Sequence, residues 1–390
     1  MDPVQLCSEL VKIRSENPPG YTDEVIGYLQ EICSRVGIET EVIQKGKKHN
    51  LLSKNMQNQL LLCGHVDVVP ALDDGWVYPP FSGRIDDSFV HGRGSTDMKG
   101  GCAALLCALE KVMNDGKDPG ADIAFVCDEE GNGDFGMGYL VKNGYIRPES
   151  CLIAEPTPSE SPVIGEKGVL RLHMTFSGDA GHSSLHPVVG NSAIMQACSF
   201  LTFCREIHEM TWPEEDLVHE VIGNTAQSLS SRLSISKEAA STMLSHVSFN
   251  PGFISGGERI NIIAQRCVLD LDMRIPWGCD IAELIRIIQS RVSDGRVEVV
   301  EAAAPTLSRP GRVCSLICEG IELVHGKKGL AGVTQAASDA RHLREIGAEV
   351  VNYGPGDLAL LHAVNEHVPI QMLNDCMDVY VHLLSNFDPS

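Results

Sequence analysis

The sequence lacks several features that point to particular classes of protein. Its 14 cysteines include no Cys-x-x-Cys pair, which argues against a zinc site built from thiolates. Basic residues are scarce, since 31 lysines and arginines stand against 52 aspartates and glutamates, for a formal net charge of −21. A surface of that sign repels nucleic acids and anionic membranes. Neither is therefore expected as a partner.

Long apolar runs are also missing, and none approaches the length that crosses a membrane. The N-terminal stretch MDPVQLCSELVKIRSENPPG is amphipathic and has no signal-peptide core. The cysteines lie in apolar stretches such as GGCAALLCALEKV, without a repeating frame, which is typical of reduced, buried thiols. We therefore expect a cytoplasmic protein. Its 390 residues are enough for two domains.

The first part of the chain alternates between helical and strand patterns. Helical periodicity covers 3–15, 23–36 and 100–113, and apolar strands are expected within 60–69, 121–130 and 150–156. Such alternation predicts an α/β fold, with a mostly parallel sheet flanked by helices. In these sheets, active sites gather beyond the carboxyl ends of the strands.

The pattern changes near residue 168. Alternating strands are expected within 168–184, 246–257 and 266–276, with a long helix at about 190–210, whereas 213–245 has too weak a pattern to assign. After residue 280 the alternation of helices and strands returns, with a helix at 281–292, a strand at 297–301 and a final helix at about 370–385. We therefore predict an α+β domain over 168–277, inserted between the two parts of the first domain, 1–167 and 278–390.

The strand LLLCGHVDVVP, residues 60–70, ends with His65 and Asp67 two positions apart. Their side chains share one face of the strand, so the carboxylate can accept one imidazole N–H and leave the other nitrogen for a metal. A strand that simply ends in solvent also carries polar residues. This pair alone does not decide between the two interpretations.

Four more stretches carry metal-capable side chains: GRGSTDMKGG, VCDEEGNGDFG, IAEPT and YGPGDLALLHAVNEHVP. Carboxylates that converge on one sheet edge repel one another unless cations compensate their charge. Two divalent ions would balance three carboxylate ligands and a hydroxide, with two neutral histidines completing the ligand set. The charges favour two metal ions over one.

With these five motifs in order, the chain resembles a family of metallopeptidases and deacylases. The family includes acetylornithine deacetylase, succinyl-diaminopimelate desuccinylase, aminoacylase and carboxypeptidase G-type enzymes, and the likeness covers nearly the whole chain, including the inserted domain. The resemblance implies an amidohydrolase with two divalent ions, zinc or alternatively cobalt. It implies that His65 and Glu155 bind one ion, that Glu130 and His362 bind the other, and that Asp97 bridges both.

The same resemblance implies roles for five further residues. Asp67 would orient the zinc-ligating histidine, and Glu129 would be the general base. His182, in GHSS, matches a histidine that the partner subunit of a homodimer supplies from its inserted dimerisation or lid domain. Asn261, in GERINIIAQ, and Arg274, in MRIP, would hold the carboxylate of a small N-acyl amino acid or short peptide. For His182, Asn261 and Arg274, an ordinary surface position is the alternative interpretation.

The substrate is less well specified. SDAR, residues 338–341, resembles the desuccinylase pattern of lysine biosynthesis, but Ala336 and Ala337 replace the expected glycine and threonine. A deacetylase like that of arginine biosynthesis, or a dipeptidase or carboxypeptidase, is the alternative. GNGDFG, residues 131–136, also fits a dinucleotide fingerprint and hence an NAD-dependent oxidoreductase. Three acidic residues directly before it would repel a pyrophosphate. A binding module without activity is disfavoured, because every ligand and base position is filled.

Overall fold

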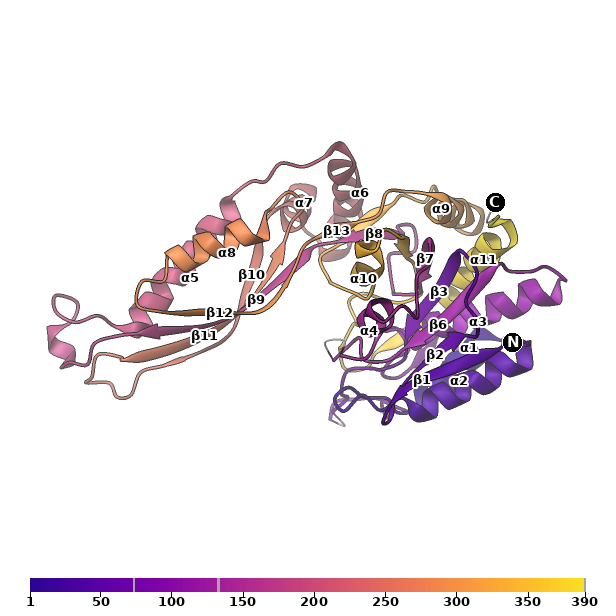
Figure 1. The fold of residues 1–390 in the computed structure, drawn as a ribbon, viewed down its shortest axis with the longest axis horizontal. Helices are drawn as coiled ribbons and strands as arrows, with labels where there is room; N and C mark the ends of the chain where they lie inside the picture. The colour runs from indigo at the N-terminus through magenta and orange to yellow at the C-terminus, as the bar shows by residue number, and fades with distance from the viewer. Residues whose placement is uncertain (73, 132–133, 389–390) are drawn as a thin grey trace. The chain divides into compact units, whose positions relative to one another are not determined.

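The computed structural model describes residues 1–72, 74–131 and 134–388. The chain forms two compact units (Figure 1). The first unit comprises Met1–Ile164, Leu307–Gly332 and Ser338–Ser390, and the second comprises Gly165–Thr306 and Val333–Ala337. The second unit is therefore inserted into the chain of the first.

The first unit is built on a nine-stranded sheet. Its order is β1-β2-β6-β3-β7-β15-β8-β13, and β14 pairs with β8. The central strands β6, β3, β7 and β15 are parallel, whereas β1 pairs with β2, β2 with β6 and β15 with β8 in antiparallel fashion. The strands are β1 (Thr40–Lys45), β2 (Lys48–Ser53), β3 (Leu60–His65), β6 (Ala121–Val126), β7 (Ser150–Ile153), β8 (Val163–Glu166), β13 (Thr306–Leu307), β14 (Gly332–Thr334) and β15 (Glu349–Asn352). The predicted α/β class is confirmed.

Helices cover both faces of this sheet. All six residues of β3 are buried, and alternate side chains of a strand point to opposite faces. Helix α3 packs on β3, α2 on β1 and β2, and α9 and α10 on β15, while α11 packs between α3 and α9. The helices are α1 (Pro3–Lys12), α2 (Asp23–Val36), α3 (Lys99–Asn114), α4 (Met137–Lys142), α9 (Arg312–His325), α10 (Ala340–Glu345) and α11 (Ile370–Asn386). A small sheet of order β16-β5-β4 joins β4 (Arg84–Ile85), β5 (Phe89–His91) and β16 (His367–Pro369).

The second unit is a four-stranded antiparallel sheet of order β10-β11-β9-β12 with helices packed on it. Its strands are β9 (Gly168–Ser177), β10 (Ser248–Gly256), β11 (Arg266–Ile275) and β12 (Gly295–Ala303). Helices α5 (Ala193–Glu209) and α8 (Ile281–Ser290) bury apolar side chains against one face of this sheet. The unit also contains the short 3₁₀ helix η1 (Ser183–Leu185).

The inserted unit extends beyond the predicted boundary at residue 277. The helix and strand after residue 278 were expected in the first domain, but β12 pairs along its length with β9 of the second unit. The unit therefore continues to Thr306. A local sequence pattern does not reveal this pairing, because β9 lies more than a hundred residues before β12 in the chain.

The unassigned stretch 213–245 forms two helices, α6 (Asp216–Leu233) and α7 (Lys237–Ser245). Ser236 caps the start of α7 by accepting a hydrogen bond from the N–H of Ala239 (3.0 Å). At the other end, the buried ammonium of Lys167 donates to the carbonyl of Met243 (3.0 Å) and to that of His246. This end of α7 is thus fixed by a residue about 76 positions away, which a local pattern does not reveal.

Two further findings concern the whole described chain. All 14 cysteines are free, and most of them are buried. In residues 1–72, 74–131 and 134–388, no helix has the length and apolar character needed to cross a membrane.

Candidate metal centre

Five side chains of the first unit come together in two overlapping groups. One group consists of His65, Asp97 and Glu155, and the other consists of Asp97, Glu130 and His362. In each group, one possible ligand atom from every residue lies within 4.8 Å of the others. Asp97 is the only residue that these two groups share, so it occupies a bridging position.

Each carboxylate oxygen of Asp97 faces a different imidazole. Its Oδ1 lies 3.0 Å from Nε2 of His65, and its Oδ2 lies 3.3 Å from Nε2 of His362. The other two carboxylates approach the same nitrogens: Glu155 Oε1 is 3.5 Å from His65 Nε2, and Glu130 Oε1 is 3.2 Å from His362 Nε2. Each imidazole nitrogen therefore faces two carboxylates.

The parallel strands bring three of these residues to one sheet edge. His65 is the last residue of β3, and Glu130 and Glu155 follow β6 and β7. Pairing aligns the ends of these strands, because His65 is opposite Val126 of β6 and the same strand pairs with β7. Asp97 comes just before α3. His362 lies between β15 and β16 with a left-handed φ of 60°, a conformation that is uncommon for a residue with a side chain.

The electrostatics of the site show a shortage of positive charge. Burial, followed by the charge of Asp97, raises the pKa of Glu155 to about 8. Burial also raises the pKa of Glu130. The adjacent carboxylates of Asp97 and Glu130 raise the pKa of His362 to about 10. Burial alone would lower the pKa of His65, but Asp97, through a hydrogen bond, and nearby carboxylates raise it well above its usual value. Because their pKa values are raised, these groups stay protonated to a higher pH than is usual for their type.

The donor set suits divalent metal ions. Carboxylate oxygens and imidazole nitrogens are the usual ligands of catalytic zinc, and three ligands per ion leave a position open for water or substrate. Oε1 of Glu130 is buried and makes no well-formed hydrogen bond to any described residue, although His362 Nε2 is 3.2 Å away. A buried carboxylate oxygen without a hydrogen-bond donor is typical of an oxygen that serves as a metal ligand. The five predicted ligands therefore fit two ions, and their roles stay predictions.

Asp67 does not contact the ring of His65 in the way that the sequence predicted. Nδ1 of His65 lies 2.9 Å from the backbone carbonyl oxygen of Asp67, whereas the side-chain Oδ1 is 3.7 Å away. The carbonyl, which is a common partner of ligand histidines, orients the ring. The carboxylate of Asp67 accepts hydrogen bonds from the N–H groups of Glu129 (3.2 Å) and Glu130 (3.1 Å). It therefore holds the loop that carries both glutamates.

A second set of polar side chains, which was not predicted from the sequence, supports this loop. The amide of Asn17 donates to Asp67 (2.8 Å) and to Asp128 (3.0 Å). Asp128, which has a left-handed φ of 68°, also accepts from the ammonium of Lys48 (2.6 Å) and from the N–H of Phe135 (3.1 Å). The position of Asp128 directly before the two glutamates was the sequence signal that could have identified it as a supporting residue. Nothing in the sequence near Asn17 indicates its contacts.

Glu129 belongs to neither of the two groups. Its backbone is fixed by the hydrogen bond to Asp67. Burial raises the pKa of its carboxyl well above the usual value, His65 lowers it, and Glu155 raises it further. A buried carboxylate outside the ligand groups suits a proton carrier, and the role of Glu129 as the base stays a prediction.

In the second unit, His182 and Asn261 lie together at one end of the sheet. The N–H of Ser183 donates to the carbonyl of Asn261 (3.1 Å), and His182 forms an isolated bridge with Ile262. Nδ1 of His182 is 2.8 Å from the hydroxyl of Ser184. This contact leaves Nε2 of the exposed imidazole as the nitrogen for another partner.

Arg274 lies at the opposite end of the same sheet. Asn261 precedes Arg266, the first residue of β11, whereas Arg274 is close to the end of that strand. Eight residues of extended chain span about 26 Å. The guanidinium of Arg274 is held by Asp272, with Nε 3.0 Å from Oδ1. The structure therefore does not bring together, within one chain, the two residues predicted to hold one substrate carboxylate.

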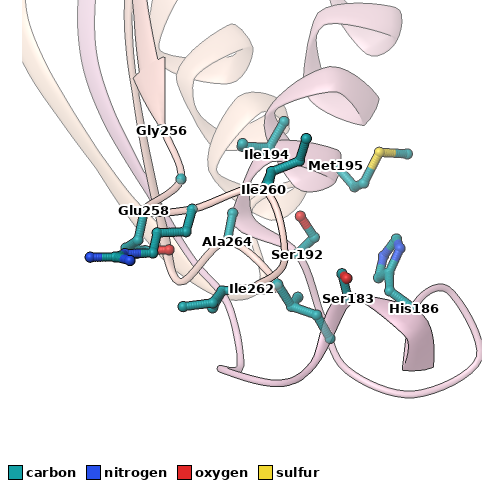
Figure 2. Close-up of a pocket in the computed structure, with 13 residues that line it drawn as sticks. Ser183, His186, Ser192, Ile194, Met195, Gly256, Glu258, Ile260, Ile262 and Ala264 are labelled. Atoms are coloured by element: carbon teal, nitrogen blue, oxygen red, sulfur yellow. The ribbon is translucent and has the colours of Figure 1, made fainter.

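Neighbours of His182 and Asn261 line a pocket of about 500 Å³ in the second unit (Figure 2). Its wall is mostly apolar, and Figure 2 shows the side chains of Ile194 and Ile260 close together above the loop 256–264. Ile260 is fully exposed, and the side chain of Met195 is more than half exposed. Such a cluster of exposed apolar residues is typical of an interaction surface.

The chain matches a known protein family over most of its length. A model of peptidase family M20/M25/M40 matches residues 61–386. The chain is similar to succinyl-diaminopimelate desuccinylase of Psychromonas ingrahamii, with 29% identity over 399 residues, covering 97% of this chain and 96% of the relative. It is also similar to the desuccinylase of Alkalilimnicola ehrlichii, with 28% identity and 98% of each chain covered.

A solved structure shares the fold over nearly the whole length. It is that of an M20 family metallo-carboxypeptidase from Sulfolobus solfataricus, with a TM-score of 0.80 and 19% identity. The alignment covers 98% of this chain and 99% of the other. At this level of identity the likeness concerns the fold.

Proposed function

Because this chain belongs to peptidase family M20/M25/M40, we propose that it hydrolyses the amide bond of a small N-acyl amino acid. Metal-dependent amide hydrolysis is the activity of this class of enzymes. The observation that carries the proposal is the pair of three-residue groups that share Asp97, with Glu129 beside them. Zinc is the proposed metal, with cobalt as the alternative, because both accept imidazole and carboxylate ligands.

The proposed mechanism divides the work among residues of this chain. Two bound divalent ions would supply Lewis acidity, which acidifies a water and polarises the scissile carbonyl. Glu129 accepts the proton of the attacking water and delivers it to the nitrogen of the leaving amine. Asp67 keeps the backbone of Glu129 in place. His182, supplied by a second copy, donates a hydrogen bond to the oxygen that becomes negative in the transition state.

For the substrate, we propose an N-succinyl amino acid such as succinyl-diaminopimelate. The likeness to desuccinylases over the full length and the SDAR stretch support it. Ala336 and Ala337 depart from the desuccinylase pattern and favour, as the second candidate, a deacetylase or a dipeptidase. Of the dinucleotide fingerprint, Asn132 and Gly133 lie outside the described residues. Membership of a hydrolase family favours amide cleavage over hydride transfer.

We infer that the active form is a homodimer, joined through the inserted unit. About 26 Å of extended strand separate Arg274 from Arg266, the residue of β11 nearest to the loop of Asn261, which is too far for both ends to touch one small substrate. Asn261 and Arg274 can act on the same molecule if one of them comes from a second copy. The exposed apolar side chains of Ile260 and Met195, near His182, support a partner surface at that end. Free, buried cysteines support a reducing compartment such as the cytoplasm.

A substrate panel on the purified protein tests this function. The protein is stripped with a chelator, reloaded with zinc or cobalt, and assayed on N-succinyl-diaminopimelate, N-acetylornithine and several dipeptides. We expect hydrolysis only after reloading, with the succinyl substrate turned over fastest. Faster cleavage of dipeptides would assign the second candidate. Absence of amide hydrolysis on the whole panel with both metals would contradict the proposed reaction.

A further inference from the structure

We propose that Arg93 and Glu366 form a buried clamp that positions Asp97 and His362 for the second metal ion. The inference rests on the proposed metal centre and assigns a role to two residues outside both ligand groups. Arg93 stands four residues before Asp97, and Glu366 stands four residues after His362. The pair thus joins the two chain segments that must meet to form the group Asp97–Glu130–His362.

The carboxylate of Glu366 organises the segment before Asp97. Its Oε1 accepts hydrogen bonds from the backbone N–H groups of Gly94 (3.0 Å), Thr96 (2.9 Å) and Asp97 (3.1 Å). The side chain of Glu366 is completely buried. Three donors on one oxygen of a buried carboxylate fix the backbone of Asp97 relative to Glu366, because charge-assisted hydrogen bonds are strong and directional.

The guanidinium of Arg93 organises the segment that contains His362. One nitrogen forms an ion pair with Oε2 of Glu366 and lies 3.3 Å from the carbonyl oxygen of Ala363. The other terminal nitrogen donates to the carbonyl oxygen of His362 (3.2 Å). Arg93 is only 4% exposed, so its charge is compensated by these acceptors rather than by water. The hydroxyl of Thr96 adds a further link to the carbonyl of His367 (2.7 Å).

The two metal groups differ in how their histidines are held. His65 ends a fully buried central strand, so the pairing of β3 with β6 fixes its backbone. His362 lies in a loop, in a left-handed conformation, and its side chain is 53% exposed. No strand pairing holds it, and the carbonyl groups of His362 and Ala363 are held by Arg93. The clamp therefore matters more to the group with His362 than to the group with His65.

Zinc titration of the chelator-stripped protein by isothermal calorimetry tests this inference. Glu366→Gln should weaken the ion held with His362 about 10- to 100-fold, the usual effect of changing a residue that supports a ligand. The other ion shares Asp97 but is also held by His65 on β3, so it should weaken to a smaller degree. Thr96→Val, which removes one link between the same segments and keeps both charges, should weaken the ion held with His362 to a smaller degree than Glu366→Gln does. If circular dichroism shows that Glu366→Gln does not fold, Thr96→Val tests the inference in its place.

Glu349→Gln is the matched control. This carboxylate also accepts three backbone N–H bonds, from Gly311, Val313 and Cys314 at the start of α9, away from the metal groups. The control should bind two zinc ions with wild-type affinities. A loss as large as that of Glu366→Gln would reveal a general effect of destabilisation and overturn the inference.

The site affected is identified by combining variants. In a His362→Ala background, Glu366→Gln should weaken the one remaining ion less than it does in a His65→Ala background. Wild-type affinity for both ions in Glu366→Gln, or equal weakening of both, would overturn the clamp. Binding of two ions with wild-type affinity by His362→Ala itself would instead contradict the proposed metal centre, so the two failures are distinguishable.

Discussion

The carboxylate of Asp67 accepts a hydrogen bond from the backbone N–H of Glu129 at 3.2 Å. The residue expected to orient a ligand histidine through its side chain therefore holds the loop of the proposed general base. Its backbone carbonyl, 2.9 Å from Nδ1 of His65, performs the orienting task instead. One residue thus links the geometry of the ligand to that of the base.

Asp67→Asn should consequently impair catalysis more than metal binding. The new amide group places an N–H where an oxygen now accepts from Glu129 or Glu130, so the loop shifts while the carbonyl contact to His65 stays. We expect the hydrolysis rate to fall about 10- to 100-fold. Zinc affinity, measured by calorimetry, should change less than in His65→Ala, and excess zinc should rescue Asp67→Asn more readily. Equal wild-type zinc affinity in both variants would remove His65 from the ligands.

The adjacent glutamates should respond differently to the same substitution. Glu129→Gln removes the proton carrier and keeps the size, so both metals should remain while the rate falls about 10²- to 10⁴-fold. Glu130→Gln should lower the occupancy of one metal. Metal analysis by mass spectrometry, together with a rate assay, separates the two cases. Near wild-type activity in Glu129→Gln would exclude it as the base.

In the metal-free protein, the contributions of Glu155 and His362 to stability should fall as the pH rises from about 6 to about 9. Burial and Asp97 raise the pKa of Glu155 to about 8, so the folded protein keeps a proton that the unfolded chain releases at lower pH. Stability is lost as the pH rises toward that value. The adjacent carboxylates of Asp97 and Glu130 raise the pKa of His362 to about 10, and its contribution is lost in the same direction.

Thermal unfolding in chelator measures this trend, with Glu155→Gln as the control that should flatten it. Added zinc should suppress the trend, because a bound cation replaces the protons. A difference in melting temperature between the wild-type protein and Glu155→Gln that stays constant over this range in chelator would show that Glu155 does not retain a proton in the metal-free fold.

Subunit exchange tests the proposed dimer. His182→Ala and Glu129→Gln should each be nearly inactive alone. After mixing in equal amounts and random exchange, half of the dimers are mixed and each has one complete site, so about a quarter of wild-type activity should return. If light scattering confirms a dimer and labelled chains confirm exchange, yet the mixture stays inactive, His182 does not act across the interface.

The sequence was sufficient to place some of the site residues on the fold. His65, Glu130 and Glu155 follow apolar strands, and the carboxyl ends of parallel strands must meet. Asp97 and His362 follow no such rule, and the family resemblance supplied them. Helix α5 and strands β9 and β11 were also predicted, because their apolar periodicity is determined by burial on one side. Strand β10 was predicted as well, although most of its residues are exposed.

The remaining features depend on contacts between distant residues. Arg93 and Glu366 lie 273 positions apart, so their ion pair has no local signature, although both occur in motifs quoted from the sequence. Strand β12 joins the second unit because β9 accepts it as a partner. The carbonyl of Asp67 replaced its carboxylate as the partner of His65 because the carboxylate is engaged by the loop of Glu129.

The most direct test of the central claim is the number of zinc ions that Asp97→Ala binds per chain, measured by calorimetric titration of the metal-free protein. Asp97 faces both histidines, with its oxygens 3.0 Å from His65 Nε2 and 3.3 Å from His362 Nε2. The wild-type protein should bind two ions, His65→Ala and His362→Ala should each retain one, and Asp97→Ala should weaken both. Two ions bound by Asp97→Ala with wild-type affinities would contradict a metal centre bridged by this residue.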